Sequence, residues 1–208
     1  MAKGHGKGSA FERDICKILS RWWTDNKRDD VFWRSTTSGA RATTRRKVGQ
    51  DTFGQHGDIQ ATDPIGQPLM DLCTIEMKRG YGSSTIGDVL DAPLKAAEQN
   101  WERWARQSHE EHLAARTEGW MLITKRDRRE TLIFMPSWLH GVIQHYEASL
   151  QLTRPSVWLR TSDERGSGET SGLRVFGTTL TQFIELVSPD SIEKAARSHR
   201  RRKLETNE

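Results

Sequence analysis

The alternating pattern of residues 73–78 constrains the fold more than any other feature of this chain. Odd positions are apolar and even positions are polar, in the order Cys73, Thr74, Ile75, Glu76, Met77 and Lys78. A period of two is typical of a β-strand with one apolar face. On such a strand Glu76 and Lys78 share the polar face, about 7 Å apart. The sequence therefore predicts a strand that presents an acid and a lysine together.

The rest of the chain alternates between helical and extended patterns. Apolar residues recur at helical spacing over residues 9–23, which predicts a first helix. A turn at 63–66 predicts that an apolar strand at 69–77 pairs back on a strand at 57–61. The other expected elements are a strand at 31–33, a helix at 91–112, paired strands at 120–124 and 131–135, a helix after Pro136, strands at 157–160 and 173–176, and a helix at 179–186. This order predicts an α/β fold with a central mixed sheet flanked by helices.

The length of 208 residues favours one domain with appendages. We expect a disordered leader at 1–8, a core at 9–136, a C-terminal α+β extension packed on the core at 137–190, and a basic tail at 191–208. The Arg/Lys run at 199–203 is compatible with nucleic-acid contact or with a disordered, solubilising segment.

Targeting and redox signals are weak. No segment approaches the roughly 18 apolar residues of a membrane span, and the N-terminus lacks the apolar core of a signal peptide. Cys16 and Cys73 are too few for a disulfide framework or a four-ligand zinc site. We therefore expect a cytoplasmic protein.

Charge is distributed unevenly along the chain. The net charge is only +4, but residues 1–50 hold 12 basic and 5 acidic side chains, whereas residues 51–100 hold 3 and 8. Residues 31–50 contain no acid, and small residues separate the basic side chains of this segment. These side chains can therefore follow a phosphate backbone. The basic residues of this segment are Arg34, Arg41, Arg45, Arg46 and Lys47. A DNA-binding loop and a solvated loop explain this segment equally well.

Three acids are candidates for metal binding: Glu12, Asp58 and Glu76. If Asp58 lies on a strand next to Glu76, the two carboxylates meet, and a divalent cation relieves their repulsion. Oxygen ligands without a His or Cys cluster favour Mg²⁺ or Mn²⁺ over zinc. Lys78 beside such a cation would hold a water molecule and neutralise charge on a phosphoryl oxygen.

These residues resemble the PD-(D/E)XK nuclease superfamily, with Gly57-Asp58 as the first half of the motif and Glu76-Met77-Lys78 as the second. Residues 8–14 (GSAFERD) and 33–39 (WRSTTSG) are similar to the opening of archaeal Holliday-junction resolvases and related phage nucleases. The resemblance covers about residues 8–135 and leaves 150–208 unexplained. Gly57 stands where the superfamily motif has Pro, a residue that supplies no ligand atom.

The resemblance implies a restriction-endonuclease-like core and a role for each matching residue. It implies metal ligation by Asp58 and Glu76, catalysis by Lys78, and metal or water positioning by Glu12. It also implies DNA contact by Arg34 and Ser38. His56, two residues before Asp58, is a further candidate for contact with metal or phosphate. Gln99 is another, because related branches of the superfamily carry a Gln on the next helix that faces the site.

Each candidate also has an ordinary explanation. Ser9 and Glu12 have the spacing of a capping box, and Glu76 with Lys78 has the spacing of a surface ion pair. His56 is compatible with a plain loop position, and Gln99 with a solvated helix surface. The order of all these features along one chain favours the nuclease.

The sequence thus predicts a Mg²⁺- or Mn²⁺-dependent endodeoxyribonuclease that acts on branched or duplex DNA in recombination or phage DNA processing. If the resemblance extends to substrate, a homodimer nicks two strands of a Holliday junction, since paired cuts need paired sites. Two alternatives stay open. One is a sequence-specific restriction-type endonuclease that reads bases through residues 138–208. The other is a DNA-binding protein without catalysis.

Overall fold

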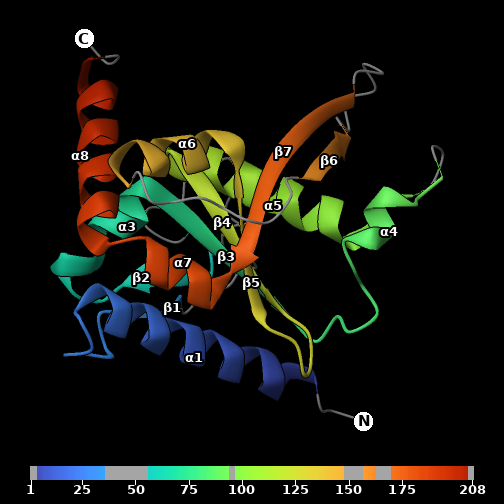
Figure 1. Ribbon diagram of the computed structural model, residues 1–208, viewed down its shortest axis with the longest axis horizontal. Coiled ribbons are helices and arrows are strands. Elements are labelled where there is room, and N and C mark those ends of the chain that lie inside the picture. The colour runs from blue at the N-terminus through green and yellow to red at the C-terminus, as the bar shows by residue number, and fades with distance from the viewer. Residues whose placement is uncertain (1–3, 36–55, 94–96, 148–156, 163–169, 206–208) are drawn as a thin grey trace, which may run out of the picture.

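A five-stranded mixed sheet organises the computed structural model, in the order β3-β4-β5-β7-β6 (Figure 1). The structure describes residues 4–35, 56–93, 97–147, 157–162 and 170–205. Strands β3 (Cys73–Arg79) and β4 (Gly119–Lys125) are parallel, and β4 pairs antiparallel with β5 (Thr131–Pro136). Strand β7 (Thr170–Thr179) pairs antiparallel with both β5 and β6 (Val157–Ser162). The α/β fold with a mixed sheet and the 120–124/131–135 strand pair are confirmed.

Helices cover both faces of this sheet. The apolar side chains of β3, Ile75 and Met77, face the larger core, which also contains residues of α1, α3, α6, α7 and α8. On the opposite face α5 packs Trp101 and Trp104 against Trp120 and other residues of the sheet. The predicted alternation in β3 is confirmed, so Glu76 points to the α5 side of the sheet.

Helix α1 (Gly4–Trp23) runs along the bottom of the view in Figure 1. It ends where the sequence predicts but begins five residues before the expected Ser9. Residues 4–8, expected in a disordered leader, therefore belong to the helix. Because Ser9 is inside the helix, the capping-box explanation of Glu12 is wrong.

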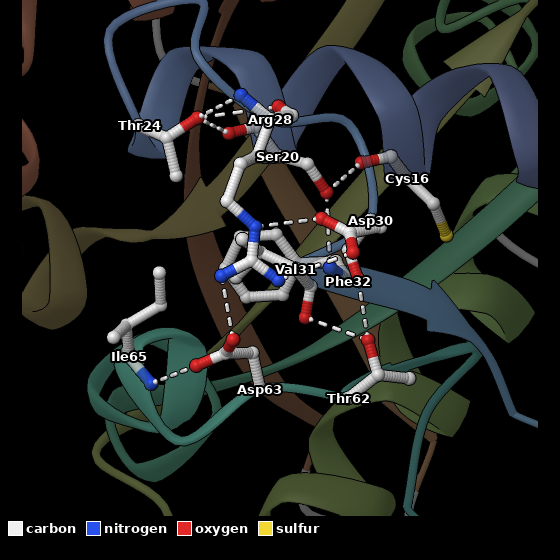
Figure 2. Close-up of polar contacts among 10 residues, drawn as sticks. All are labelled: Cys16, Ser20, Thr24, Arg28, Asp30, Val31, Phe32, Thr62, Asp63 and Ile65. Carbon is white, nitrogen blue, oxygen red and sulfur yellow. Dashed lines mark hydrogen bonds and ion pairs between the residues drawn. The ribbon is translucent and has the colours of Figure 1, made fainter.

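A buried hydroxyl connects α1 to the small second sheet. Strands β1 (Phe32–Arg34) and β2 (Ile59–Ala61) form an antiparallel pair. Ser20 donates to the Cys16 carbonyl at 2.8 Å and accepts the Phe32 N–H at 2.9 Å (Figure 2). At the surface beside it, Arg28 donates to Asp63 at 2.6 Å. These bonds fix the entry into β1, which leads toward Asp58.

The segment between β2 and β3 differs from the expected hairpin. Asp63 accepts the Ile65 N–H at 3.0 Å and caps a 3-10 turn, η1 (Pro64–Gly66), which continues into α3 (Gln67–Leu72). Leu69 and Leu72 are buried and have helical spacing, because they belong to α3. The strand expected at 69–77 therefore begins only at Cys73. The expected pairing of this strand with 57–61 is also wrong, because β2 pairs with β1 in a separate sheet and β3 pairs with β4.

The helix expected at 91–112 is shorter at its start and longer at its end. A four-residue helix, α4 (Gly87–Leu90), comes first, and α5 spans Asn100–Ala115. Gln99 is the N-cap of α5, and its N–H donates to the Glu102 carboxylate at 2.8 Å to complete a capping box. Local capping chemistry therefore places the helix start at Asn100.

The C-terminal third packs onto the same sheet. Helix α6 (Ser137–Tyr146) follows β5 as predicted, and α7 (Leu180–Leu186) begins after the N-cap Thr179. Most of the segment expected as a basic tail forms α8 (Pro189–Glu205), which buries Ile192, Ala195 and Ala196. Among the described residues, no helix is long and apolar enough to cross a membrane.

Candidate active site

A tight turn at Gly57 brings Asp58 to the middle of β3. Ser35 donates its N–H to the Asp58 carbonyl and its hydroxyl to the Gly57 carbonyl, both at 2.9 Å. The Asp58 N–H donates to the Ile75 carbonyl at 2.8 Å, and Asp58 Oδ2 accepts the Met77 N–H at 2.8 Å. The carboxylate is thereby held against β3 without a regular strand ladder.

Glycine is required at position 57 for two reasons. Its φ of +76° lies in the left-handed region, which favours glycine. A Cβ there would also lie 2.8 Å from the Ile75 carbonyl oxygen. Proline, with φ near −65°, is incompatible with this turn. The departure from the Pro-Asp motif is thus a structural requirement of this chain.

Glu76 and Lys78 lie on the same face of β3, as predicted. Lys78 Nζ donates to Glu76 Oε2 at 2.8 Å, and Glu76 is only 4% exposed. Asp58 is also buried, at 9% exposure, and lies close enough to Glu76 for each carboxyl to shift the pKa of the other. The predicted meeting of the two acids is present, although a turn rather than an adjacent strand of the same sheet delivers Asp58.

The burial of these groups shifts their pKa values. Burial, followed by the charge of Asp58, raises the pKa of Glu76 well above its ordinary 4.5. Burial also raises the pKa of Asp58, against the opposing hydrogen bond from the Met77 N–H. For Lys78, burial lowers the pKa, but the charge and hydrogen bond of Glu76 outweigh it and the net shift is upward. Lys78 is therefore a fixed cation between two acids that compete for a proton.

Two residues of α5 that the sequence interpretation missed complete the site. Gln107 Nε2 donates to Glu76 Oε1 and to Glu111 Oε1, both at 3.2 Å. Glu111 Oε2 accepts the Gly57 N–H at 3.0 Å. The i, i+4 spacing of Gln107 and Glu111 indicates in the sequence that the two side chains share one face of a helix. Only the packing of α5 on β3 shows that this face meets Glu76 and Gly57.

Glu12 approaches the site from α1. Arg34 Nε lies 3.3 Å from Glu12 Oε2. Burial raises the pKa of Glu12, the nearby charge of Asp58 adds to this, and Arg34 opposes it. Helix α1 and strand β1 thus bring Glu12 and Arg34 together next to Asp58. In this structure Arg34 is paired with an acid, so a phosphate would have to compete for it.

The remaining predicted residues are placed as follows. Gln99 does not face the site: its side chain caps α5 and donates to the Ala97 carbonyl at 2.9 Å. Gln107, two turns later, is the glutamine that contacts Glu76. His56 is half-buried next to Gly57, and its role stays a prediction. Five predicted DNA-binding residues lie outside the described residues, namely Ser38, Arg41, Arg45, Arg46 and Lys47.

The donor set fits a hard divalent cation. Among the described residues, no group of three or more His, Cys, Asp or Glu side chains forms a ready-made cage. Mg²⁺ does not need one, since it is usually held by one or two carboxylates together with water and substrate phosphate. The electrostatically linked groups here are four acids and three cations: Glu12, Asp58, Glu76, Glu111, Arg13, Arg34 and Lys78. This excess of negative charge favours a cation between Asp58 and Glu76.

Comparison with known families places the site within a described family. A family model described as phage putative PDDEXK endonuclease matches residues 3–194. Comparison with curated proteins and with solved structures finds no match. The matched segment contains the whole site, from Glu12 to Glu111, and stops before the basic run at 199–203.

Proposed function

The chain belongs to the family of phage putative PDDEXK endonucleases, and from this premise we propose that it is an endodeoxyribonuclease dependent on Mg²⁺ or Mn²⁺. The observation that carries the proposal is the buried arrangement of Asp58, Glu76 and Lys78. Two acids at 9% and 4% exposure are brought together beside a lysine that is bonded to one of them. Burying such a set is unfavourable without a cation or ligand to compensate, and active sites are where such groups gather.

Each residue has a defined task in this proposal. Asp58 and Glu76 would hold the cation, which supplies Lewis-acid stabilisation of charge on the phosphoryl group. Lys78, kept as an ammonium, would orient the attacking water and stabilise negative charge on a phosphoryl oxygen. Its raised pKa argues against a role as general base. Gln107 and Glu111 would position Glu76 and the Gly57 turn.

The proposed reaction is hydrolysis of a phosphodiester bond. The water oxygen bonds to phosphorus, the bond from phosphorus to the 3′-oxygen breaks, and a proton from the water ends on that 3′-oxygen. The products carry a 5′-phosphate and a 3′-hydroxyl. Arg34 would contact the substrate backbone next to the cleaved bond.

The proposed substrate is branched DNA such as a four-way junction, in recombination or phage DNA processing. This part of the proposal rests on the similarity of the segments around Glu12 and Arg34 to junction resolvases. A symmetric junction needs two cuts, so the proposal includes a homodimer with one site per subunit. Sedimentation of the protein with and without junction DNA measures this directly.

The test compares nicking of supercoiled plasmid, four-way junction and linear duplex in Mg²⁺, in Mn²⁺ and in a chelator. We expect cleavage only with a divalent cation, and at least about 100-fold slower cleavage by Glu76→Gln and Lys78→Met. Glu130→Gln and Lys194→Met make the same changes at exposed positions and should cleave like the wild type.

Three results would change the assignment. A defined cut site on linear duplex would favour the restriction-type alternative. Tight DNA binding with no cleavage in either cation would favour a non-catalytic binding protein. Full activity of Glu76→Gln would show that the catalytic centre lies elsewhere.

A further inference from the structure

An exposed tyrosine, Tyr81, lies just after the strand that carries Glu76 and Lys78. It is the third residue after Lys78, and it is 43% exposed. Its ring meets the buried ring of Trp104 in α5 edge to face, with centroids 4.8 Å apart and planes inclined at 62°. An edge-to-face contact covers at most one face of a ring. At least one face of Tyr81 is therefore left uncovered by Trp104.

The loop around Tyr81 is held in place from both sides. The Tyr81 carbonyl accepts the Ser84 N–H at 3.0 Å, which closes a turn. Ser84 is buried, and its hydroxyl accepts a hydrogen bond from Asn100 of α5 at 2.6 Å. Trp104 packs in turn on Trp101, with centroids 5.3 Å apart. Because ring and backbone are positioned in advance, a ligand that binds the ring has less ordering entropy to overcome.

The space on both sides of this ring is open. Gly80 and Gly82 flank Tyr81, and a Cβ on either glycine would meet no atom of the described residues within 4 Å. The flanking residues therefore add no side chain that competes for the ring. A planar aromatic ligand is the kind that stacks on a free aromatic face. In a protein that acts on DNA, a nucleobase is such a ligand.

Two independent connections relate Tyr81 to the candidate active site. Along the chain, three residues from Lys78 to Tyr81 span at most about 11 Å between Cα atoms. Through α5, Trp104 faces the sheet one turn before Gln107, which contacts Glu76 on that sheet. One DNA strand carries a phosphate about every 3.4 Å of axis. The ring of Tyr81 is therefore about three nucleotides or fewer from a phosphate held at Lys78.

We propose that Tyr81 stacks on an unpaired base of the DNA substrate close to the cleaved bond. In a continuous duplex both faces of each base are covered by its neighbours, and taking a base out of the stack costs free energy. A base at a branch point or in a flap already has a free face. The ring would thus favour branched DNA at any sequence, because every base has an aromatic face. The inference rests on the proposed function and assigns a residue to its choice of substrate.

Two substitutions at position 81 isolate the contribution of the ring. Tyr81→Leu removes the ring but keeps an apolar side chain, whereas Tyr81→Phe keeps the ring. Because the side chain is exposed, both variants should fold and melt close to the wild type. In a chelator, Tyr81→Leu should bind a flapped duplex about 5- to 150-fold more weakly, the effect of losing one base stack. Tyr81→Phe should bind it like the wild type, and neither variant should change the affinity for a fully paired duplex.

Photo-cross-linking tests the contact in the wild-type protein. The probe is a flapped duplex with 5-iodouracil at the first unpaired position, and mass spectrometry of the digested complex identifies the cross-linked residue. We expect Tyr81 to be the main one. Ser83→Ala changes another exposed residue of the same turn and is the control for both assays, in which it should behave like the wild type.

Several results would overturn the inference. They are unchanged affinity of Tyr81→Leu, an equal loss for flapped and fully paired DNA, an equal loss in Tyr81→Phe or Ser83→Ala, and a cross-link only to other residues. If the wild type cleaves plasmid in Mg²⁺ while Tyr81→Leu binds flapped DNA normally, only this inference is wrong. If the wild type neither binds nor cleaves DNA, the proposed function is wrong as well.

Discussion

Replacing Gly57 with alanine tests whether its turn holds the candidate active site together. The left-handed backbone costs an alanine about 1–2 kcal/mol relative to glycine. The new Cβ would also lie 2.8 Å from the Ile75 carbonyl oxygen and 3.1 Å from the Ile75 nitrogen, both backbone atoms of β3. Relieving such a clash costs about 1–3 kcal/mol. The free energy of unfolding should therefore fall by about 2–5 kcal/mol.

Gly80→Ala is the matched control. Gly80 also has a positive φ, of +94°, but a Cβ there meets nothing within 4 Å. It should lose only the backbone part, about 1–2 kcal/mol. Chemical denaturation of both variants gives the difference directly. In thermal melts Gly57→Ala should lie about 4–20 °C below the wild type, since 1 kcal/mol shifts the melting temperature of a chain this size by about 2–4 °C.

Cleavage provides the second measurement. Relief of the clash moves the Gly57 turn away from β3 and takes the Asp58 carboxylate with it. A displacement of about 1 Å in a catalytic group can lower the rate about 100-fold. If Gly57→Ala is as stable as Gly80→Ala and cleaves at the wild-type rate, the turn does not position Asp58 and the proposed site geometry is wrong.

The other predictions concern the remaining polar contacts. Ser20→Ala should lower the free energy of unfolding by about 1–3 kcal/mol, because the buried Phe32 N–H loses its acceptor, whereas the exposed Ser83→Ala should change nothing in the same denaturation assay. Gln107→Ala should weaken Mn²⁺ binding about 10- to 100-fold by calorimetry, since it orients Glu76; unchanged affinity would exclude that role. Without divalent cation, the melting temperature should fall as pH rises from about 4.5 toward the raised pKa of Glu76. The folded state retains a proton there that the unfolded state has lost. Glu76→Gln should flatten this dependence and Mg²⁺ should oppose it; an unchanged slope in Glu76→Gln would assign the effect to other groups.

The sequence predicts the local parts of this fold well. The alternation around Glu76 depends only on neighbouring residues, so the strand, its buried face and the position of Lys78 could be predicted. The predicted start of α5 is wrong because Gln99 and Glu102 form a capping box, and the helical pattern of apolar residues alone does not locate this box. The predicted strand start at residue 69 is wrong because Asp63 caps a helical segment that precedes β3.

Long-range contacts explain what else could not be predicted. Parallel pairing of β3 with β4 depends on where the intervening α5 packs, and a parallel crossover leaves no turn signal. The same packing decides that Gln107 and Glu111, rather than Gln99, face the acids. The folding of residues 199–203 into α8 was also unpredictable, because the anchoring contact is with Glu118, more than 80 residues earlier in the chain.

The glycine before Asp58 and the acid on α5 are coupled features of this site. Glu111 accepts the Gly57 N–H, a donor that proline does not have. A chain with the Pro-Asp form of the motif would leave the half-buried carboxylate at position 111 without this bond, next to the two buried acids Asp58 and Glu76. Glycine therefore does more here than permit a turn, because its amide stabilises a further negative charge beside the candidate cation site. By this reasoning Gly57→Pro, which restores the common motif, should impair the enzyme more than Gly57→Ala, and Glu111→Ala should not rescue it, because the φ of +76° still excludes proline.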